Sequence, residues 1–385
     1  MKGAPFREER PAAPRDIYPA FRRVNPPARK PSDNPEIGET RKLAQTFLQI
    51  DTDEGVSGIA GPLSGEATAI YIEKQIKPLL IGQDPFLTEY LWDVMYRTAV
   101  NGRMGENMIA ISYVDVALWD IKGKFLKQPV VRLLGGPVQE RLPVYASAVG
   151  FSLAPDKVKE RVAKLKGEGF CGTKWFLRKG PVDGIQGERE NIAVIAAARE
   201  ASGPDVKIMV DAWAYWDIPY TLKMADALKE FDVTWIEEPL HYALRDSYAE
   251  LTRLSPIPIA GGEHEFTRWS FKDLMDIRAM DIYQPEPMWA GGISEMVKIG
   301  ALATSYGVKL MYHVYYPVAS AHVSFALNPL TTPMGEYLYN AADEYQYFLK
   351  KPLKPVNGFF YPPEAPGIGM DIDEQKIESE RELSF

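Results

Sequence analysis

The stretches VKIMVDAW (206–213), VTWIEEP (233–239) and IPIAGGEH (257–264) decide the fold of this chain. Each is a short apolar run that leads into acidic residues, and helical segments such as PYTLKMADALKEF (219–231) lie between them. Apolar runs that alternate with helical segments predict βαβ units and a parallel sheet.

Five further apolar runs continue this alternation on both sides of the central three. They are LPVYASAV (142–149), GTKWF (172–176), DIYQPEP (281–287), KLMYHVYY (309–316) and MGEYLY (334–339). Helices are expected at ERVAKLKGEG (160–169), FKDLMDI (271–277) and ISEMVKIGALATSYG (293–307). Eight parallel strands favour an α/β closed barrel over an open sheet.

A different pattern precedes the barrel. Residues 1–38 are rich in Pro and Arg and lack periodicity, which indicates an extended arm. Residues 42–62 alternate around a DEG turn, as a β-hairpin does, and residues 68–100 and 107–128 show helical periodicity. In the second helical region, one stripe carries Ile111, Val114, Leu118 and Ile121. An α+β module of about 95 residues is therefore expected ahead of the barrel.

Composition excludes several classes of protein. The formal net charge of −8 argues against a nucleic-acid partner, which would need a basic face. No signal-peptide pattern and no run of about 18 apolar residues is present, so no membrane partner and a cytoplasmic location are expected. The single cysteine, Cys171, fits a reducing compartment and is expected to be a buried core residue.

Ionisable residues stand at or near the C-terminal ends of the last six expected strands. They are Asp211, Glu237, Glu263, Glu286, His313 and Glu336. In a parallel barrel these ends meet at one rim, where barrel active sites lie. Crowded carboxylates repel one another unless a cation neutralises them.

Asp211, Glu237 and Glu263 come from three consecutive strands and are the expected metal ligands. Three oxygen ligands leave about half of an octahedral shell open, which suits Mg²⁺ that also binds substrate oxygens. No Cys/His cluster supports zinc. Any one of these acids alone would more often cap a helix or pair with a lysine, but three in register favour a cofactor.

His313 and Glu286 fall on neighbouring strands, so the carboxylate can orient the imidazole as a general base. A metal-bound carboxylate substrate would be acidified at its α-carbon through an enediolate while His313 removes the proton. Glu336 could bond the enediolate if it is protonated, or could simply cap the last strand.

Three residues are expected to bind substrate. Lys174 could polarise the substrate carboxylate. Trp213 suits the face of a sugar, although a rim tryptophan more often only packs. His264 could reach substrate from the rim, yet strand alternation points it away from Glu263. An equal alternative is that His264 supports the metal ligands and does not contact substrate.

The chain resembles the mandelate-racemase branch of the enolase superfamily from about residue 42 to about 370. SYVDVALWDIKGKFLKQPVVRLLGG (112–136) is similar to the junction between the capping domain and the barrel of that family. VDAW, WIEEP and AGGE resemble its metal-ligand motifs, QPEPMWAGGIS followed by YH resembles its acid–histidine dyad, and MGEYL resembles its last-strand glutamate motif.

The resemblance implies a modified TIM barrel, (β/α)7β, with an N-terminal α+β capping domain that the C-terminal segment completes. On that pattern the arm covers 1–38, the capping domain 39–136, the barrel 137–345 and the returning segment 346–385. A homo-oligomer is also implied. GTKWFLRKGP, DAWAYWD and GEHEF look most like the L-rhamnonate dehydratase subgroup, which implies Mg²⁺-dependent dehydration of an aldonate to a 2-keto-3-deoxy acid.

Two departures from the family pattern bear on the reaction. The family often has Lys-x-Lys at the end of the second strand, where this chain has Lys174-Trp175-Phe176, so a base on the opposite face is missing. A single histidine suits syn-elimination better than racemisation. Position 286 is Glu where the family usually has Asp. A racemase or epimerase that uses Lys174 as its other base, and a non-catalytic barrel that binds sugar acids, remain the alternatives.

Overall fold

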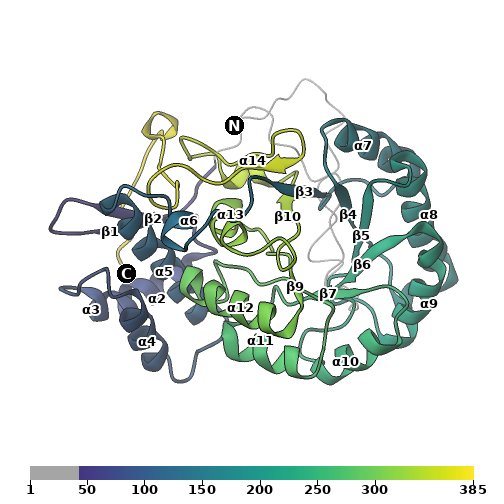
Figure 1. Ribbon diagram of the computed structural model, residues 1–385, viewed down its shortest axis with the longest axis horizontal. Helices are drawn as coiled ribbons and strands as arrows, with labels where there is room; N and C mark the ends of the chain where they lie inside the picture. Colours follow the sequence, from purple (N-terminus) through teal and green to yellow (C-terminus); the bar gives the residue numbers. More distant parts are fainter. Residues whose placement is uncertain (1–42) are drawn as a thin grey trace.

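Strands curl around a central axis beside an N-terminal α+β domain in the computed structural model, which describes residues 43–385 (Figure 1). The expected arm, residues 1–38, lies outside the described residues. The parallel barrel strands are β3 (Leu142–Ser147), β4 (Gly172–Phe176), β5 (Lys207–Asp211), β6 (Val233–Glu237), β7 (Ile259–Gly261), β8 (Ile282–Tyr283), β9 (Lys309–Leu310) and β10 (Gly335–Leu338).

The strands are ordered β10-β3-β4-β5-β6-β7-β8-β9, so all neighbours except β10 and β3 are consecutive in sequence. Between the two ends of this path, the Leu310 N–H donates to the carbonyl of Thr331 at 2.7 Å, in the segment that leads into β10. Short β11 (Phe359–Phe360) adds an antiparallel pairing to β3. This is the modified TIM-barrel fold expected from the sequence.

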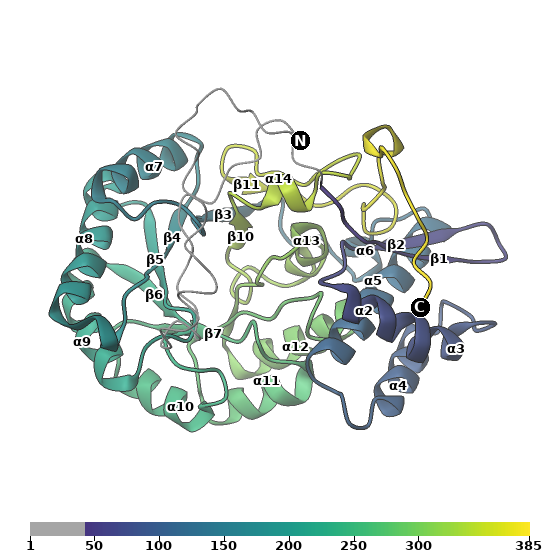
Figure 2. The same ribbon diagram turned by 180° about the vertical axis from the view of Figure 1, so that it is seen from behind.

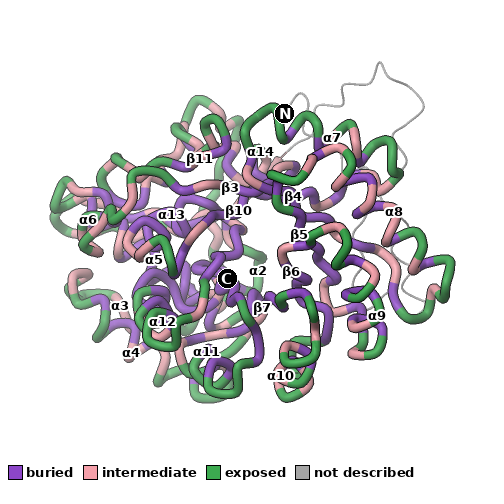
Figure 3. Tube along the Cα trace, turned by 45° about the vertical axis from the view of Figure 1, so that its right-hand side comes forward, coloured by how far each residue is buried: buried purple, intermediate pink, exposed green. Residues whose placement is uncertain are grey.

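Helices form the outer ring of the barrel, and their outward faces are exposed (Figures 1 and 3). Asp217 caps the N-terminus of α9 by accepting from Tyr220 N–H, and Gly307 in left-handed conformation follows α12. The helices are α7 (Pro155–Gly167), α8 (Gly184–Ser202), α9 (Ile218–Leu228), α10 (Arg245–Leu254), α11 (Thr267–Asp276), α12 (Gly292–Tyr306), α13 (Pro317–Ala326) and α14 (Ala342–Tyr345).

An interior layer fills the barrel beneath its C-terminal rim. Most of its strands contribute one side chain each to this layer, which consists of Tyr145, Met209, Trp235, Ala260, Ile282, Met311 and Met334. Successive strand residues point to opposite faces, so the residue two positions after an interior one is interior again. This period of two carries Asp211 above Met209 and Glu237 above Trp235, at the rim.

The β8 and β9 regions are less regular than the sequence predicts. Strands were expected over 281–287 and 309–316, but regular strand covers only β8 and β9 as given above. Pro285 and Pro287 have no N–H, so they interrupt the ladder. Pairing continues in part, because Met311 N–H donates to Tyr283 O at 3.0 Å and His313 N–H to Pro285 O at 3.2 Å.

The N-terminal domain combines the expected hairpin with helices. Its hairpin pairs β1 with β2 antiparallel, and the stripe Ile111, Val114, Leu118 and Ile121 is buried in α5. The region expected to be helical over 68–100 is divided into several pieces. The elements are β1 (Leu48–Asp51), β2 (Ser57–Ala60), α2 (Glu66–Tyr71), a π-helical turn (Ile72–Ile76), α3 (Lys77–Leu80), α4 (Thr88–Thr98), α5 (Glu106–Phe125) and α6 (Val130–Leu133).

The C-terminal segment returns from the barrel to this domain, as Figures 1 and 2 show near α2 and β1. Ile368 N–H donates to the Asp120 carboxylate of α5 at 2.8 Å, and Val130 N–H donates to Gly367 O at 3.0 Å. The boundaries 39–136, 137–345 and 346–385 remain predictions. Within residues 43–385, no helix has the combined length and apolar character needed to cross a membrane.

Candidate active site

Asp211 and Glu237 lie side by side at the C-terminal ends of β5 and β6. They are direct partners in the strand register, and their side chains are buried at the rim. Burial raises the pKa of Asp211 well above its usual value, and the neighbouring charge and hydrogen bond of Glu237 add to the shift. The sequence prediction that these two carboxylates meet is consistent with this geometry.

Lys174 on β4 places its ammonium among three carboxylates. Its nitrogen lies 3.3 Å from Asp211 Oδ2 and 2.9 Å from Glu336 Oε1, and it also donates to Glu237. The side chain is 1% exposed. Burial alone would lower the pKa of Lys174, but Glu237 and Glu336 outweigh it and raise the pKa well above the usual value. Lys174 is therefore a fixed cation within the site.

Glu263 follows β7 and connects the acidic half of the site to its histidines. One carboxylate oxygen lies 3.4 Å from His313 Nε2, and the other lies 3.7 Å from His264 Nδ1. Burial raises the pKa of Glu263, against the opposing influence of His313, and Glu237 adds a further raising contribution. Glu263 also raises the pKa of Asp211. Among residues 43–385, however, the trio whose ligand atoms lie within 4.8 Å of one another is Glu238, Glu263 and His264, which shares only Glu263 with the expected metal ligands.

Glu286 and His313 form the expected pair. His313 Nδ1 lies 3.0 Å from Glu286 Oε2, which also accepts from Tyr315 N–H at 2.7 Å. The other oxygen accepts from Met288 N–H at 2.9 Å, so the longer glutamate arm is held at both oxygens. Burial would lower the pKa of His313, but the charge of Glu263 and the bond to Glu286 raise it to about 10.

Glu336 on β10 is fully buried and faces Lys174 and His313. Burial would raise its pKa, yet the positive charge of Lys174, and then that of His313, lowers it below the usual value. The ionised form is favoured, so the expectation of a protonated Glu336 finds no support here.

His264 and Trp213 occupy the loops after β7 and β5. The expectation that His264 points away from Glu263 is wrong, because β7 ends at Gly261 and Gly262 has a φ of +108°, so strand alternation does not apply. His264 instead bonds to Glu238 at 2.9 Å. Trp213 has a φ of +41°, and its main-chain N–H donates to the Asp211 carboxylate at 2.9 Å. No contact within residues 43–385 tests a substrate role for either residue.

Two buried residues of the site were not identified from sequence. Glu238 is 2% exposed, and its carboxylate lies within 4.8 Å of ligand atoms on Glu263 and His264. Gln284 donates to Glu237 Oε2 at 2.7 Å. The doubled glutamate of WIEEP was a usable signal for Glu238. Its orientation was not readable, because Glu238 has a φ of +38°, which turns the chain out of strand geometry.

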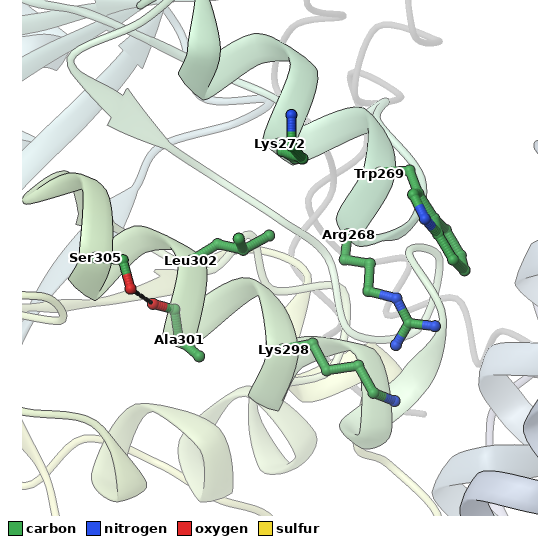
Figure 4. A pocket seen from close by; sticks show the side chains of 7 residues that line it. All are labelled: Arg268, Trp269, Lys272, Lys298, Ala301, Leu302 and Ser305. Atoms are coloured by element: carbon green, nitrogen blue, oxygen red, sulfur yellow. Dashed lines mark hydrogen bonds between the residues drawn. The ribbon is translucent and has the colours of Figure 1, made fainter.

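A separate pocket of about 430 Å³ lies on the outside of the barrel between α11 and α12, and it contains none of the site residues (Figure 4). Arg268 and Lys298, which line it, each pair with Glu295. The chemistry-bearing residues are therefore gathered at the rim of the strands and not in this outer pocket.

Comparison with known proteins places the chain in a family. Residues 157–376 match the enolase C-terminal domain-like family, and residues 22–135 match the N-terminal domain of mandelate racemase and muconate lactonizing enzyme. The chain therefore belongs to the enolase superfamily, in its mandelate racemase and muconate lactonizing enzyme group.

Its relatives within that superfamily include enzymes named as acid-sugar dehydratases. The chain is 35% identical to L-rhamnonate dehydratase of Saccharopolyspora erythraea, over 86% of this chain and 84% of the relative. It is 36% identical to arabinonate dehydratase of Saccharolobus solfataricus, over 84% and 87% of the two chains. The crystal structure of Gibberella zeae rhamnonate dehydratase with Mg superposes with a TM-score of 0.78 and 33% identity, covering 86% and 81%.

Proposed function

We propose that this protein is a Mg²⁺-dependent dehydratase that converts an aldonate into its 2-keto-3-deoxy acid. One observation carries the proposal: three buried carboxylates, Asp211, Glu237 and Glu263, stand at or just after the ends of three adjacent barrel strands, and Glu263 lies 3.4 Å from the histidine of the Glu286–His313 pair. Relatives named as dehydratases of rhamnonate and arabinonate support the same substrate class.

The donor set fits Mg²⁺. Buried carboxylate oxygens are the ligands that a hard divalent cation prefers. Burial is the main cause that raises the pKa of Asp211 and of Glu263, and a bound cation would favour the ionised form of both. Asp211, Glu237 and Glu263 would hold the ion. Bound there, Mg²⁺ would neutralise the carboxylates, weaken the interaction that keeps His313 protonated, and stabilise negative charge on the substrate carboxylate as the α-proton leaves.

His313 would perform both proton transfers. Its Nε2 faces Glu263 while Nδ1 is bonded to Glu286, so Nε2 is the nitrogen that can meet substrate. It would take the α-proton of the aldonate and return it to the 3-hydroxyl, which leaves as water when the C3–O bond breaks. The resulting enol converts to the 2-keto-3-deoxy acid. Lys174 and Glu336 would form the opposite wall, with Lys174 compensating negative charge.

The alternative racemase or epimerase needs a second base. Lys174 was the candidate, but its ammonium donates to or pairs with Asp211, Glu237 and Glu336, an environment that stabilises the charged form. Asp211 and Glu237 are also the proposed Mg²⁺ ligands, so this pairing describes the metal-free protein. The feature that favours elimination over racemisation is the missing second lysine, with Phe176 in its place.

The test is a panel of aldonates and aldarates incubated with the purified protein and Mg²⁺, with 2-keto-3-deoxy products detected by semicarbazone absorbance. Turnover of one or more aldonates that is lost after EDTA treatment and regained with Mg²⁺ is expected. Deuterium exchange at the α-carbon without keto-acid formation would establish the epimerase alternative. Sugar-acid binding without any turnover would establish a non-catalytic barrel. The homo-oligomer, the cytoplasmic location and the absence of nucleic-acid and membrane partners stay predictions.

A further inference from the structure

Trp289 lies in the loop between β8 and α12, in the turn that follows Glu286. Its main-chain N–H donates to Glu286 O at 3.0 Å, and the preceding Met288 N–H donates to the Glu286 carboxylate at 2.9 Å. The residue that orients His313 therefore also fixes the backbone that carries this indole.

The indole ring packs near both histidines of the site. Its centroid is 5.3 Å from that of His313 and 6.3 Å from that of His264, and it also packs against Tyr315 at 5.6 Å. Both histidines approach Glu263 from their own sides. The ring is thus held by packing against the imidazole that would meet substrate.

The indole N–H of Trp289 is a buried donor without a protein acceptor among residues 43–385. Other tryptophans of the chain differ in this respect. The indole nitrogens of Trp92, Trp119, Trp175, Trp216 and Trp235 all donate, at distances of 2.7 to 3.0 Å. An indole nitrogen can only donate, and an unpaired buried donor costs free energy. An acceptor oxygen of a bound molecule would remove that cost.

We propose that the Trp289 indole N–H donates a hydrogen bond to a non-reacting hydroxyl of the sugar acid and so selects among substrates. This inference rests on the proposed function, since it takes an aldonate as the occupant. The reacting 2- and 3-positions belong to His313 and the metal ligands, which leaves the hydroxyls from C4 onward. A site built to pair with a substrate hydroxyl rejects analogues that lack it.

The experiment compares wild type with Trp289→Phe on the best aldonate and on its 4-, 5- and 6-deoxy analogues. Phenylalanine keeps an aromatic ring against His313 but has no donor. Trp119→Phe is the matched control, because it removes an N–H that is already paired, with the Ser294 hydroxyl between α5 and α12. The same ligands are also titrated calorimetrically into His313→Asn and into the His313→Asn, Trp289→Phe double variant, which measures binding without turnover.

We expect Trp289→Phe to lower kcat/KM for the full aldonate by about tenfold to a hundredfold and to leave it nearly unchanged for one particular deoxy analogue. Calorimetric affinities should follow the same pattern, and Trp119→Phe should not alter selectivity. An equal loss for every ligand would show that the N–H serves only a water or the packing, and would overturn the inference. Unchanged selectivity with an active wild type would also overturn it. A wild type inactive on every aldonate would instead refute the proposed function.

Discussion

Two groups of buried carboxylates can be compared in this molecule. One is at the barrel rim, and the other, called the joint, is on α5, where this helix contacts α12, β2 and the C-terminal segment. At the joint, Asp115 accepts from the main-chain N–H and the hydroxyl of Ser294 at 2.9 and 2.6 Å. Asp120 accepts from Ile59 and Ile368 N–H groups and pairs with Lys124. Each acid at the joint therefore has its donors within the protein.

The rim has a different balance of charge. Its buried carboxylates face one lysine and two histidines, so negative groups outnumber positive ones among the described residues; they are Asp211, Glu237, Glu238, Glu263, Glu286 and Glu336. Buried acids that accept hydrogen bonds from the protein stabilise the fold. Acids that crowd together with too few positive groups repel one another, and a bound cation would relieve that repulsion. The same chemical group thus has a structural role in one place and a predicted ligand role in the other.

The largest effect is expected at the rim and in activity alone. His313→Asn should lower kcat on an active aldonate by about a thousandfold or more, because both proton transfers pass through this imidazole. Mg²⁺ affinity measured by calorimetry and the melting temperature should change little. Activity within tenfold of wild type would remove His313 from the mechanism.

At the joint, the corresponding substitution should change stability and not metal binding. Asp120→Ala leaves the N–H groups of Ile59 and Ile368 without their acceptor and removes one partner of Lys124, which keeps Asp371 and the Ser57 carbonyl; we expect a loss of about 2–3 kcal/mol in the free energy of unfolding. Denaturant unfolding measures this loss, with Asp120→Asn as the milder control. A change below about 1 kcal/mol would mean that other groups replace Asp120 as acceptor for these N–H groups.

The free energy of unfolding should also depend on pH through a histidine at the joint. His322 accepts from Val131 N–H at 2.9 Å and bonds Ile368 O at 3.0 Å, and burial lowers its pKa to about 4. The unfolded chain binds this proton near pH 6.5, so the stability contributed by neutral His322 is lost as the pH falls below that value. Between pH 7 and pH 5 the loss should be about 2 kcal/mol.

His322→Asn removes this titration and isolates its contribution. Asp115, whose pKa burial raises to about 7, changes stability in the opposite direction over the same range, so wild type alone does not report on His322. The unfolding free energies of wild type and variant should converge as the pH is lowered from 7 to 5. Parallel curves would show that the pKa of His322 is the same in the folded and unfolded states.

The smallest effect should be a gain in stability at the rim. Asp211→Asn removes one charge from a crowded group, so the metal-free protein should become about 1 kcal/mol more stable while Mg²⁺ affinity falls sharply. Thermal unfolding in EDTA and Mg²⁺ titration measure the two quantities. A destabilised variant would show that the Asp211 pairing with Lys174 outweighs the repulsion.

The sequence predicted the positions of some rim residues but not those of their immediate neighbours. The positions of Asp211 and Glu237 followed from strand periodicity, which holds as long as the backbone is regular strand. His264 and Glu238 did not follow, because Gly262 and Glu238 have positive φ values and the alternation ends there. The ionisation of Glu336 could not be predicted either, because it depends on Lys174, which lies far from Glu336 in the sequence.

By itself, the sequence determined the alternation of strands and helices, the gathering of acids at the strand ends and the Glu286–His313 pair, because each depends on local periodicity or on one repeat of βα structure. Only the tertiary structure decided which carboxylates Lys174 contacts, where His264 turns and that the Trp289 indole N–H has no acceptor within residues 43–385. Those contacts join residues from different loops, and their direction depends on backbone angles and burial that no periodic pattern encodes.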